Sequence, residues 1–233
     1  MEFITEFFST IHWGAVAQII MIDILLGGDN AVVIALACRN LPAKQRKQGI
    51  FWGVFGAIAL RVVLIKCSVY LLQLPFLKVV AGALLVWIGV KLLVPHEEED
   101  SNIEASTKLL GAIKTIIVAD LVMSIDNVIG IAGAAQQAAA HHQTILIIFG
   151  LLVSVPFIIF GSQVILKLFD RFPIIVTLGA ALLGWIGGGL IVGDVMLTEY
   201  ITDTKTVHYV AAVAGALLVV GLGEIIKRKR ASK

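Results

Sequence analysis

The chain has little charge and few cysteines, and both shortages limit what it can be. Only 15% of its 233 residues are charged, whereas 59% are hydrophobic, and the mean hydropathy is +0.98. A soluble core of this size cannot bury so much apolar surface, so the composition indicates an integral membrane protein. The two cysteines, Cys38 and Cys67, lie in apolar segments without metal-site spacing, and we expect both to be buried, inert thiols.

The motifs of soluble catalysis are also missing. The sequence contains no Walker motif, no glycine-rich phosphate loop and no nucleophile triad. Its two longest hydrophilic stretches, 95–108 and 193–208, are too short to form a soluble domain. We therefore expect neither an enzyme nor an ATP-driven pump, and neither a resident cofactor nor a nucleic-acid partner.

Apolar segments long enough to cross a bilayer recur along the chain. A membrane helix needs about 20 apolar residues, and seven segments approach this length: 12–38, 49–73, 76–94, 109–135, 144–167, 173–192 and 209–226. The acidic N-terminus lacks the basic start of a signal peptide, so we expect the first segment to be retained. The sequence predicts an all-α protein with seven transmembrane helices, forming one multi-pass domain (1–233) in the cell membrane.

Lysine and arginine gather in alternate loops and thereby predict the orientation. Basic residues crowd the loop at 39–47 and the tail at 227–230, whereas the loops on the other side contain only Lys78 and Lys205. Because basic loops face the cytoplasm, the N-terminus is predicted to lie outside and the C-terminus in the cytoplasm.

Two stretches within the apolar segments carry the same polar motif, D-x5-D-N. The first runs from Asp23 to Asp29-Asn30, and the second, 97 residues later, from Asp120 to Asp126-Asn127. A charged side chain at the centre of a membrane helix costs about 2.5–3.5 kcal/mol, so four acids cost about 10–14 kcal/mol. The simplest reason for keeping them is a bound cation.

The repeat extends beyond the acids and predicts the architecture. At an offset of 97 or 98 residues, Trp52-Gly53 aligns with Phe149-Gly150, Pro75 with Pro173, and Trp87-Ile88-Gly89 with Trp185-Ile186-Gly187. The segments therefore form repeat A (12–94) and repeat B (109–192), followed by an extra C-terminal helix at 209–226. Three crossings per repeat make the two copies run in opposite directions, as in secondary transporters with a midplane site.

The spacing within the motif ranks its members as ligands. On an unbroken helix, residues six apart differ by about 120° and ~9 Å, but the pair Gly27-Gly28 permits a break. The second copy has Ser124-Ile125 there, which makes a break less expected. Carboxylate and amide oxygens suit Mg²⁺, Ca²⁺ or Mn²⁺. The stronger ligand candidates are Asp29, Asn30, Asp126 and Asn127; the weaker ones, as ligands or proton carriers, are Asp23 and Asp120.

Two basic residues in the second segment leave alternatives open. Arg61 and Lys66 either form structural ion pairs with the aspartates, compete with a transported cation, or bind an oxyanion or another small solute. Two bases cannot balance four acids, and the deficit of two charges fits one divalent cation or protons. The counterpart of Arg61 in repeat B is Ile158, so the symmetry is broken there.

The motifs G-G-D-N (Gly27–Asn30) and S-I-D-N (Ser124–Asn127), with the three-helix repeats, resemble the TerC integral membrane family and its bacterial YjbE-type metal-transport branch. The family is named for tellurium resistance, and several members are linked to manganese export and metal homeostasis. The resemblance implies that Asp29 and Asp126 bind the ion, that the ion is Mn²⁺ and that it is exported. The charge deficit makes protons the candidate coupling ion. A non-transporting membrane partner in metal delivery remains an alternative, and the oligomeric state is left open.

Overall fold

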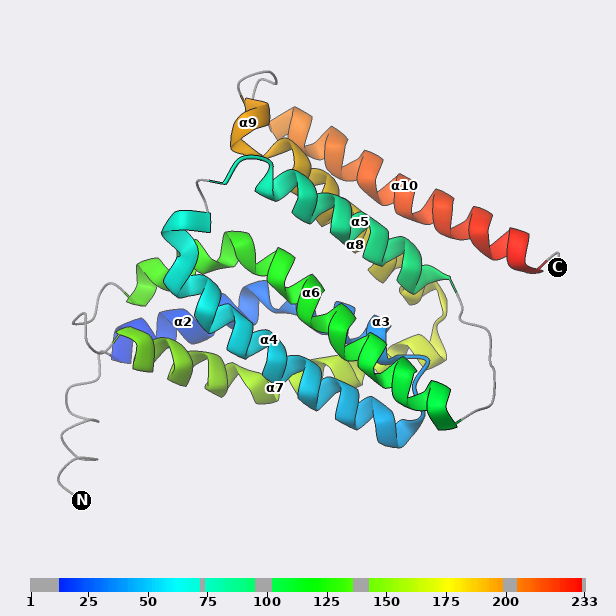
Figure 1. Ribbon diagram of the computed structural model, residues 1–233, viewed down its shortest axis with the longest axis horizontal. Helices are drawn as coiled ribbons and strands as arrows, with labels where there is room; N and C mark the ends of the chain where they lie inside the picture. The colour runs from blue at the N-terminus through cyan, green and yellow to red at the C-terminus, as the bar shows by residue number, and fades with distance from the viewer. Residues whose placement is uncertain (1–12, 72–73, 95–101, 136–142, 199–204, 232–233) are drawn as a thin grey trace.

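The computed structural model describes residues 13–71, 74–94, 102–135, 143–198 and 205–231, and every regular element in these ranges is a helix (Figure 1). In chain order the helices are α2 (Trp13–Leu26), α3 (Gly28–Cys38), α4 (Ala43–Leu71), α5 (Leu77–Leu93), α6 (Asn102–Ala135), α7 (Gln143–Arg171), α8 (Ile174–Val192), α9 (Val195–Thr198) and α10 (Lys205–Ala231). The predicted all-α fold is confirmed for these residues.

Among the described residues, the helices differ in whether they are long and apolar enough to span a membrane. Helices α4, α7, α8 and α10 meet both conditions, and α2 with α3 adds a fifth span if the bent pair is taken as one. Helix α5 has 17 residues and is therefore about 26 Å long, shorter than the ~30 Å hydrocarbon core. Each predicted segment contains a helix, but the count of seven crossings stays a prediction.

The helices form two groups (Figure 1). In the first group, α4 packs along α6, while α2 and α3 contact both α6 and α7. In the second group, α8 lies between α5 and α10 and contacts both of them. The groups meet where α5 touches α6 and where α3 touches α8.

The first predicted span is broken at the glycine pair. Helix α2 ends at Leu26, α3 begins at Gly28, and their axes differ by 50°. Gly27 is buried at the bend, and a Cβ atom there would collide with the backbone carbonyl oxygen of Asp23. The structure thus contains the break that the sequence permitted, whereas α6 runs through Ser124-Ile125 without interruption.

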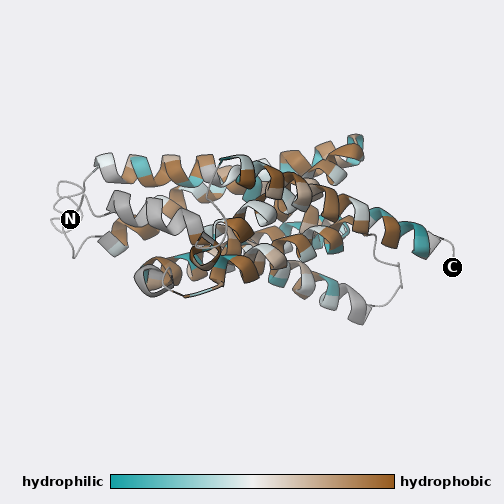
Figure 2. Cartoon of the chain, turned by 90° about the horizontal axis from the view of Figure 1, so that it is seen from above, coloured by the Kyte–Doolittle hydropathy of each residue, from teal (hydrophilic) through white to brown (hydrophobic). Residues whose placement is uncertain are grey.

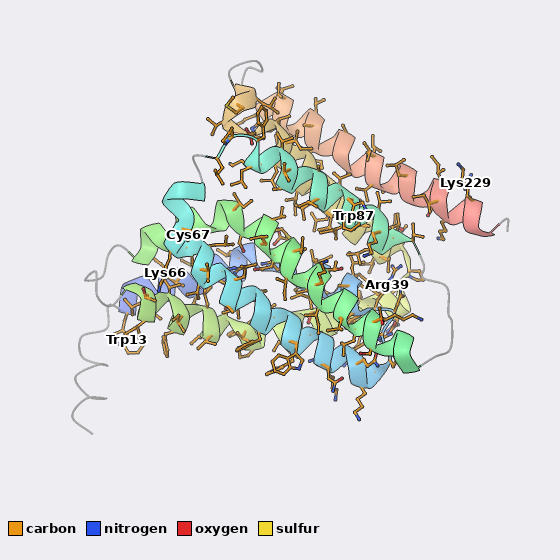
Figure 3. The ribbon with its side chains drawn as sticks, viewed as in Figure 1. Trp13, Arg39, Lys66, Cys67, Trp87 and Lys229 are labelled. Atoms are coloured by element: carbon orange, nitrogen blue, oxygen red, sulfur yellow. The ribbon has the colours of Figure 1, made fainter. Side chains whose placement is uncertain are left out.

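Apolar residues run along most of the helices (Figure 2), and many large ones lie exposed on the outside of the bundle. Phe160 is 70% exposed and Leu217 is 68% exposed, as expected for side chains on surfaces that face lipid. Cys38 is buried as predicted, but the prediction for Cys67 was wrong, because this thiol lies exposed on α4 (Figure 3). In a membrane protein, apolar sequence neighbours do not imply burial.

Candidate functional site

A single arginine connects three helices in the middle of the first group. Arg61 on α4 is 2% exposed, although it carries a full charge. Its Nη1 donates to an Asp23 carboxylate oxygen on α2, its Nη2 to an Asp120 carboxylate oxygen on α6, and its Nε to Ser124 Oγ at 2.9 Å. All three guanidinium nitrogens are therefore engaged.

Two serines complete the arrangement. Ser154 Oγ on α7 donates to the second carboxylate oxygen of Asp23, and Ser124 Oγ donates to Asp120 Oδ2 at 3.2 Å. These contacts join α2, α4, α6 and α7 through buried polar groups. We call the five residues the Arg61 cluster: Asp23, Arg61, Asp120, Ser124 and Ser154.

The Arg61 cluster has one positive charge for two carboxylates. With both acids ionised, its formal charge is −1, in a region where Asp23, Arg61 and Asp120 are all buried. Buried ions are costly to desolvate and are tolerated only when paired and hydrogen-bonded. The cluster satisfies the bonding requirement but leaves one formal negative charge when both acids are ionised.

The break between α2 and α3 separates the two acids of the first motif. Asp23 precedes the bend and joins the Arg61 cluster, whereas Asp29 follows it, is half-buried, and accepts a bond from the Asn30 backbone N–H at 3.1 Å. The Asn30 side chain is 4% exposed, and neither its amide oxygen nor its amide nitrogen has a hydrogen-bond partner among the described residues. Unpaired buried amides are rare and indicate a missing ligand or water.

A small cavity lies beside this asparagine. It has a volume of about 20 Å³, its polar walls come from Asn30, Arg61 and Asp120, and the rest of its wall is aliphatic. A space of this size holds about one water molecule or one small ion. The first Asp-Asn pair and the Arg61 cluster therefore share one buried, polar space.

The described residues do not bring three metal-binding side chains together. Within the described ranges, no group of three His, Cys, Asp or Glu side chains is arranged to hold a metal ion. Asp23 and Asp120, the weaker ligand candidates, are occupied by Arg61. Asp126 and Asn127 belong to α6, but their side chains lie outside the described residues, so their predicted role as ligands stays a prediction.

Comparison with known proteins places the chain in a family. The sequence model of the integral membrane protein TerC family matches residues 8–231. The chain belongs to the TerC family. It is 45% identical to the uncharacterized membrane protein YjbE of Bacillus subtilis over 190 residues, which are 82% of this chain and 84% of that protein.

More distant relatives agree with this assignment. The uncharacterized membrane protein YceF of Bacillus subtilis is 26% identical over 183 residues, covering 75% of this chain and 69% of YceF. The UPF0053 inner membrane protein YgdQ of Escherichia coli K12 is 24% identical over 197 residues, which are 77% of this chain and 80% of YgdQ. No solved structure matches this chain. The family and the apolar helices make it a multi-pass membrane protein.

Arg61 and Lys66 lie in different surroundings in this TerC-family chain. Arg61 is enclosed by the cluster, whereas Lys66, further along α4, is exposed and lies near Cys67 (Figure 3). An oxyanion site made by both side chains would need them to face one space. The arrangement instead agrees with the alternative in which Arg61 pairs with aspartates.

Sequence reasoning missed two buried polar residues. Ser154 was not identified from the sequence. It is an isolated polar residue in the apolar α7 segment, one helical turn after Gly150 and Leu151, and such a residue can indicate a buried polar contact. Asp194 was seen only as part of a hydrophilic loop. Its carboxylate accepts backbone N–H groups of Lys78 at 2.9 Å, Val79 at 3.3 Å and Met196 at 3.0 Å, so it ties the start of α5 to the end of α8.

Proposed function

We propose that the chain is a secondary, ion-coupled exporter of a divalent metal cation, with Mn²⁺ as the substrate. The observation that carries the proposal is the Arg61 cluster, a buried group with excess negative charge beside a broken helix of a membrane protein. Ionisable residues inside membrane bundles mark ion pathways, and broken helices form the midplane sites of secondary transporters. The TerC resemblance supplies manganese, and the oxygen ligands agree with it.

In this proposal the two parts of the motif have different roles. Asp29 and Asn30, the latter with an unpartnered amide oxygen, bind the cation together with Asp126 and Asn127 of the second copy. Arg61 holds Asp23 and Asp120 when no cation is bound and releases them when one enters. Protons from outside then replace the metal charge during the return step.

The proposed inverted repeat has support in the packing of glycines. A Cβ atom added to Gly53 would come within 2.6 Å of Ile116 Cδ1, and one added to Gly150 within 2.5 Å of Ile19 Cγ2. At the offset of 97 residues, Gly53 corresponds to Gly150 and Ile19 to Ile116. The same contact therefore occurs twice with the repeats exchanged, as a two-fold axis requires.

The interface between α5 and α8 repeats the pattern. Gly82 lies against the backbone of Gly187, and a Cβ atom on Gly89 would lie 3.1 Å from the carbonyl oxygen of Ala180. At the offset of 98 residues, Gly82 corresponds to Ala180 and Gly89 to Gly187. This exchange supports two three-helix repeats related by a two-fold axis. Inversion of the repeats, seven crossings and an N-terminus outside remain part of the proposal.

Flux measurements in proteoliposomes test the proposal. We expect uptake or release of Mn²⁺ to exceed that of Ca²⁺ and Mg²⁺ and to depend on a pH gradient. Asp29→Asn and Asp126→Asn are expected to lower the flux at least tenfold, because each removes a ligand charge. Glu224→Gln, on α10 near Lys227, is the matched control and is expected to transport normally.

Other outcomes would select the alternatives. Wild-type flux in both aspartate variants would show that the ion site lies elsewhere. Metal binding without any flux would favour a non-transporting partner in metal delivery. Flux of an oxyanion that requires Arg61 and ignores divalent metals would favour the solute exporter, which has less support because all three guanidinium nitrogens are already bonded.

A further inference from the structure

A second cavity lies at one end of the bundle, where α3 and α5 end and α6 begins. Its volume is about 290 Å³, far larger than the space beside Asn30. Among the described residues that line it, five are polar or basic and none is acidic. We call it the lysine pocket, after its polar wall: Asn40, Lys91, Thr107, Lys108 and Thr115.

The chemistry of this wall suits a phosphate group. The two ammonium groups supply positive charge, and the hydroxyl and amide groups add hydrogen-bond donors; lysine is a common phosphate ligand. Lys91 Nζ lies 5.2 Å from the centre of the Trp87 ring, a cation–π contact that steadies the ammonium group. Lys108 is half-buried, so its charge is only partly hydrated. The pocket thus places two ammonium groups and three other hydrogen-bonding side chains around one space.

The surroundings of the pocket indicate a source for the phosphate. Trp87 is exposed on α5 close to Lys91, as expected of a side chain at the level of lipid headgroups (Figure 3). The basic tail of α10 lies at the same end of the bundle (Figure 1). Basic pockets between membrane helices on the cytoplasmic side bind anionic lipid headgroups.

We propose that the lysine pocket binds the phosphate group of an anionic species, either the headgroup of an anionic phospholipid or a free phosphate ion. Such a ligand would place its phosphate between Lys91 and Lys108. The two sources share this chemistry and differ in whether the ligand arrives from the bilayer or from water.

The position of the pocket gives the binding a consequence for transport. Leu36 in its wall lies within one turn of Val33, which lines the small cavity, and Thr115 is next to Ile116, which does the same. The lysine pocket therefore lies along α3 and α6 within one helical turn of residues that line the small cavity. Two ammonium groups there repel a divalent cation, and a bound phosphate offsets this repulsion. This consequence rests on the proposed function, whereas the binding itself does not.

Lipid binding to the purified full chain is the direct test. The protein in a neutral detergent is titrated with phosphatidylglycerol, with phosphatidylcholine and with inorganic phosphate, and bound ligand is counted by native mass spectrometry. We expect phosphatidylglycerol to bind and phosphatidylcholine not to bind. Lys91→Gln combined with Lys108→Gln is expected to weaken binding about thirtyfold, at roughly fivefold per lysine.

Two further variants separate the pocket from general surface charge. Lys44→Gln with Lys47→Gln removes two exposed lysines of α4 outside the pocket and is expected to leave binding unchanged. Gly111→Leu keeps both pocket lysines but fills the space, because a Cβ atom on Gly111 has no neighbour within 4 Å. We expect this variant, which also gains helix propensity, to lose binding at least tenfold while its thermal unfolding stays unchanged.

Each outcome decides the proposal. Competition of inorganic phosphate with phosphatidylglycerol at similar concentrations assigns the site to a free anion, and its absence assigns it to the lipid. Equal loss in both double-lysine variants, or full binding by Gly111→Leu, would overturn the pocket. If binding follows the pocket variants but no metal is transported, only the proposed function fails; if both hold, phosphatidylglycerol in the vesicles raises Mn²⁺ flux.

Discussion

The two groups of helices in this molecule are held together in opposite ways. Around the Arg61 cluster, α2, α4, α6 and α7 meet through buried charges and hydroxyl groups. Between α8 and α10, backbones touch directly: Gly184 lies against Gly215, and Gly188 against Ala211. Lipid offers helices no hydrophobic drive to associate, so polar bonds and close packing of small residues are the two available solutions.

The difference indicates which part moves and which part supports. The Arg61 region contains a broken helix, an unpartnered Asn30 amide, a small cavity and an unbalanced charge. In the proposed transport cycle, each of these features changes when an ion binds. The glycine contacts do not, because backbone atoms already touch and a packed interface does not deform gradually. We infer that α5, α8 and α10 form the scaffold and that the Arg61 region rearranges.

Removing the arginine should have the largest effect. Arg61→Ile leaves two buried carboxylates without a positive partner, although each keeps its serine, and is expected to cost about 3–5 kcal/mol of unfolding free energy. The measurement is thermal unfolding of the purified protein in detergent, with Lys66→Ile on the exposed face of α4 as the control. If the two variants unfold at the same temperature, the cluster is not holding the helices.

A second substitution tests whether positions 61 and 158 are equivalent in the two repeats. Ile158, the counterpart of Arg61, is buried and lines the same small cavity. Moving the charge, by combining Arg61→Ile with Ile158→Arg, is expected to recover at least half of the lost stability. No recovery would count against two-fold equivalence of these positions.

Crowding the glycine interface between α8 and α10 should cause the next largest loss in free energy of unfolding. A Cβ atom on Gly188 would collide with the backbone of Ala211, whereas one on Gly189 meets nothing within 4 Å. We expect Gly188→Ala to cost about 1–3 kcal/mol through overpacking and Gly189→Ala to be neutral or to stabilise by up to ~1 kcal/mol. Thermal unfolding of the two variants side by side measures the difference, and equal values would disprove the close contact.

Removing the Asp194 contacts between α5 and α8 should lower the free energy of unfolding slightly less than crowding Gly188. Asp194→Ala leaves the first backbone N–H groups of α5 without their acceptor and is expected to cost about 1–3 kcal/mol. Asp170→Ala is the control, because the ion pair of Asp170 with Arg46 is 3.6 Å long and exposed, and such pairs contribute under about 1 kcal/mol. An Asp194 variant as stable as the control would show that water replaces the carboxylate.

The serine contacts should give the smallest effect. Ser154→Ala removes a hydrogen bond to the Asp23 carboxylate, which keeps its ion pair with Arg61, and is expected to cost about 0.5–1.5 kcal/mol. Ser162 is equally buried on α7, and among the described residues its hydroxyl bonds to the carbonyl of Ile159 in its own helix at 2.9 Å. Ser162→Ala is therefore expected to change stability by less than about 1 kcal/mol, and a larger loss there than at Ser154 would contradict this account.

Part of this site followed from local sequence. The motif D-x5-D-N and the glycine pair located the break in the first span, because a glycine pair changes the backbone wherever it stands. The offset of 97 residues likewise paired Asp23 with Asp120 before their joint contact with Arg61 was known. These inferences needed only neighbours in the chain or a comparison of the chain with itself.

The sequence by itself determined a helical membrane protein with acids in its apolar segments, because composition and spacing are local properties. Only the tertiary structure decided that Arg61 would take Asp23 and Asp120 together, that Ser154 would join them, and that Cys67 would face outward. The physical reason is the bilayer. When lipid accepts apolar side chains on every outer surface, hydrophobicity no longer distinguishes the inner face of a helix from the outer one. The few polar contacts between helices must then select which faces meet.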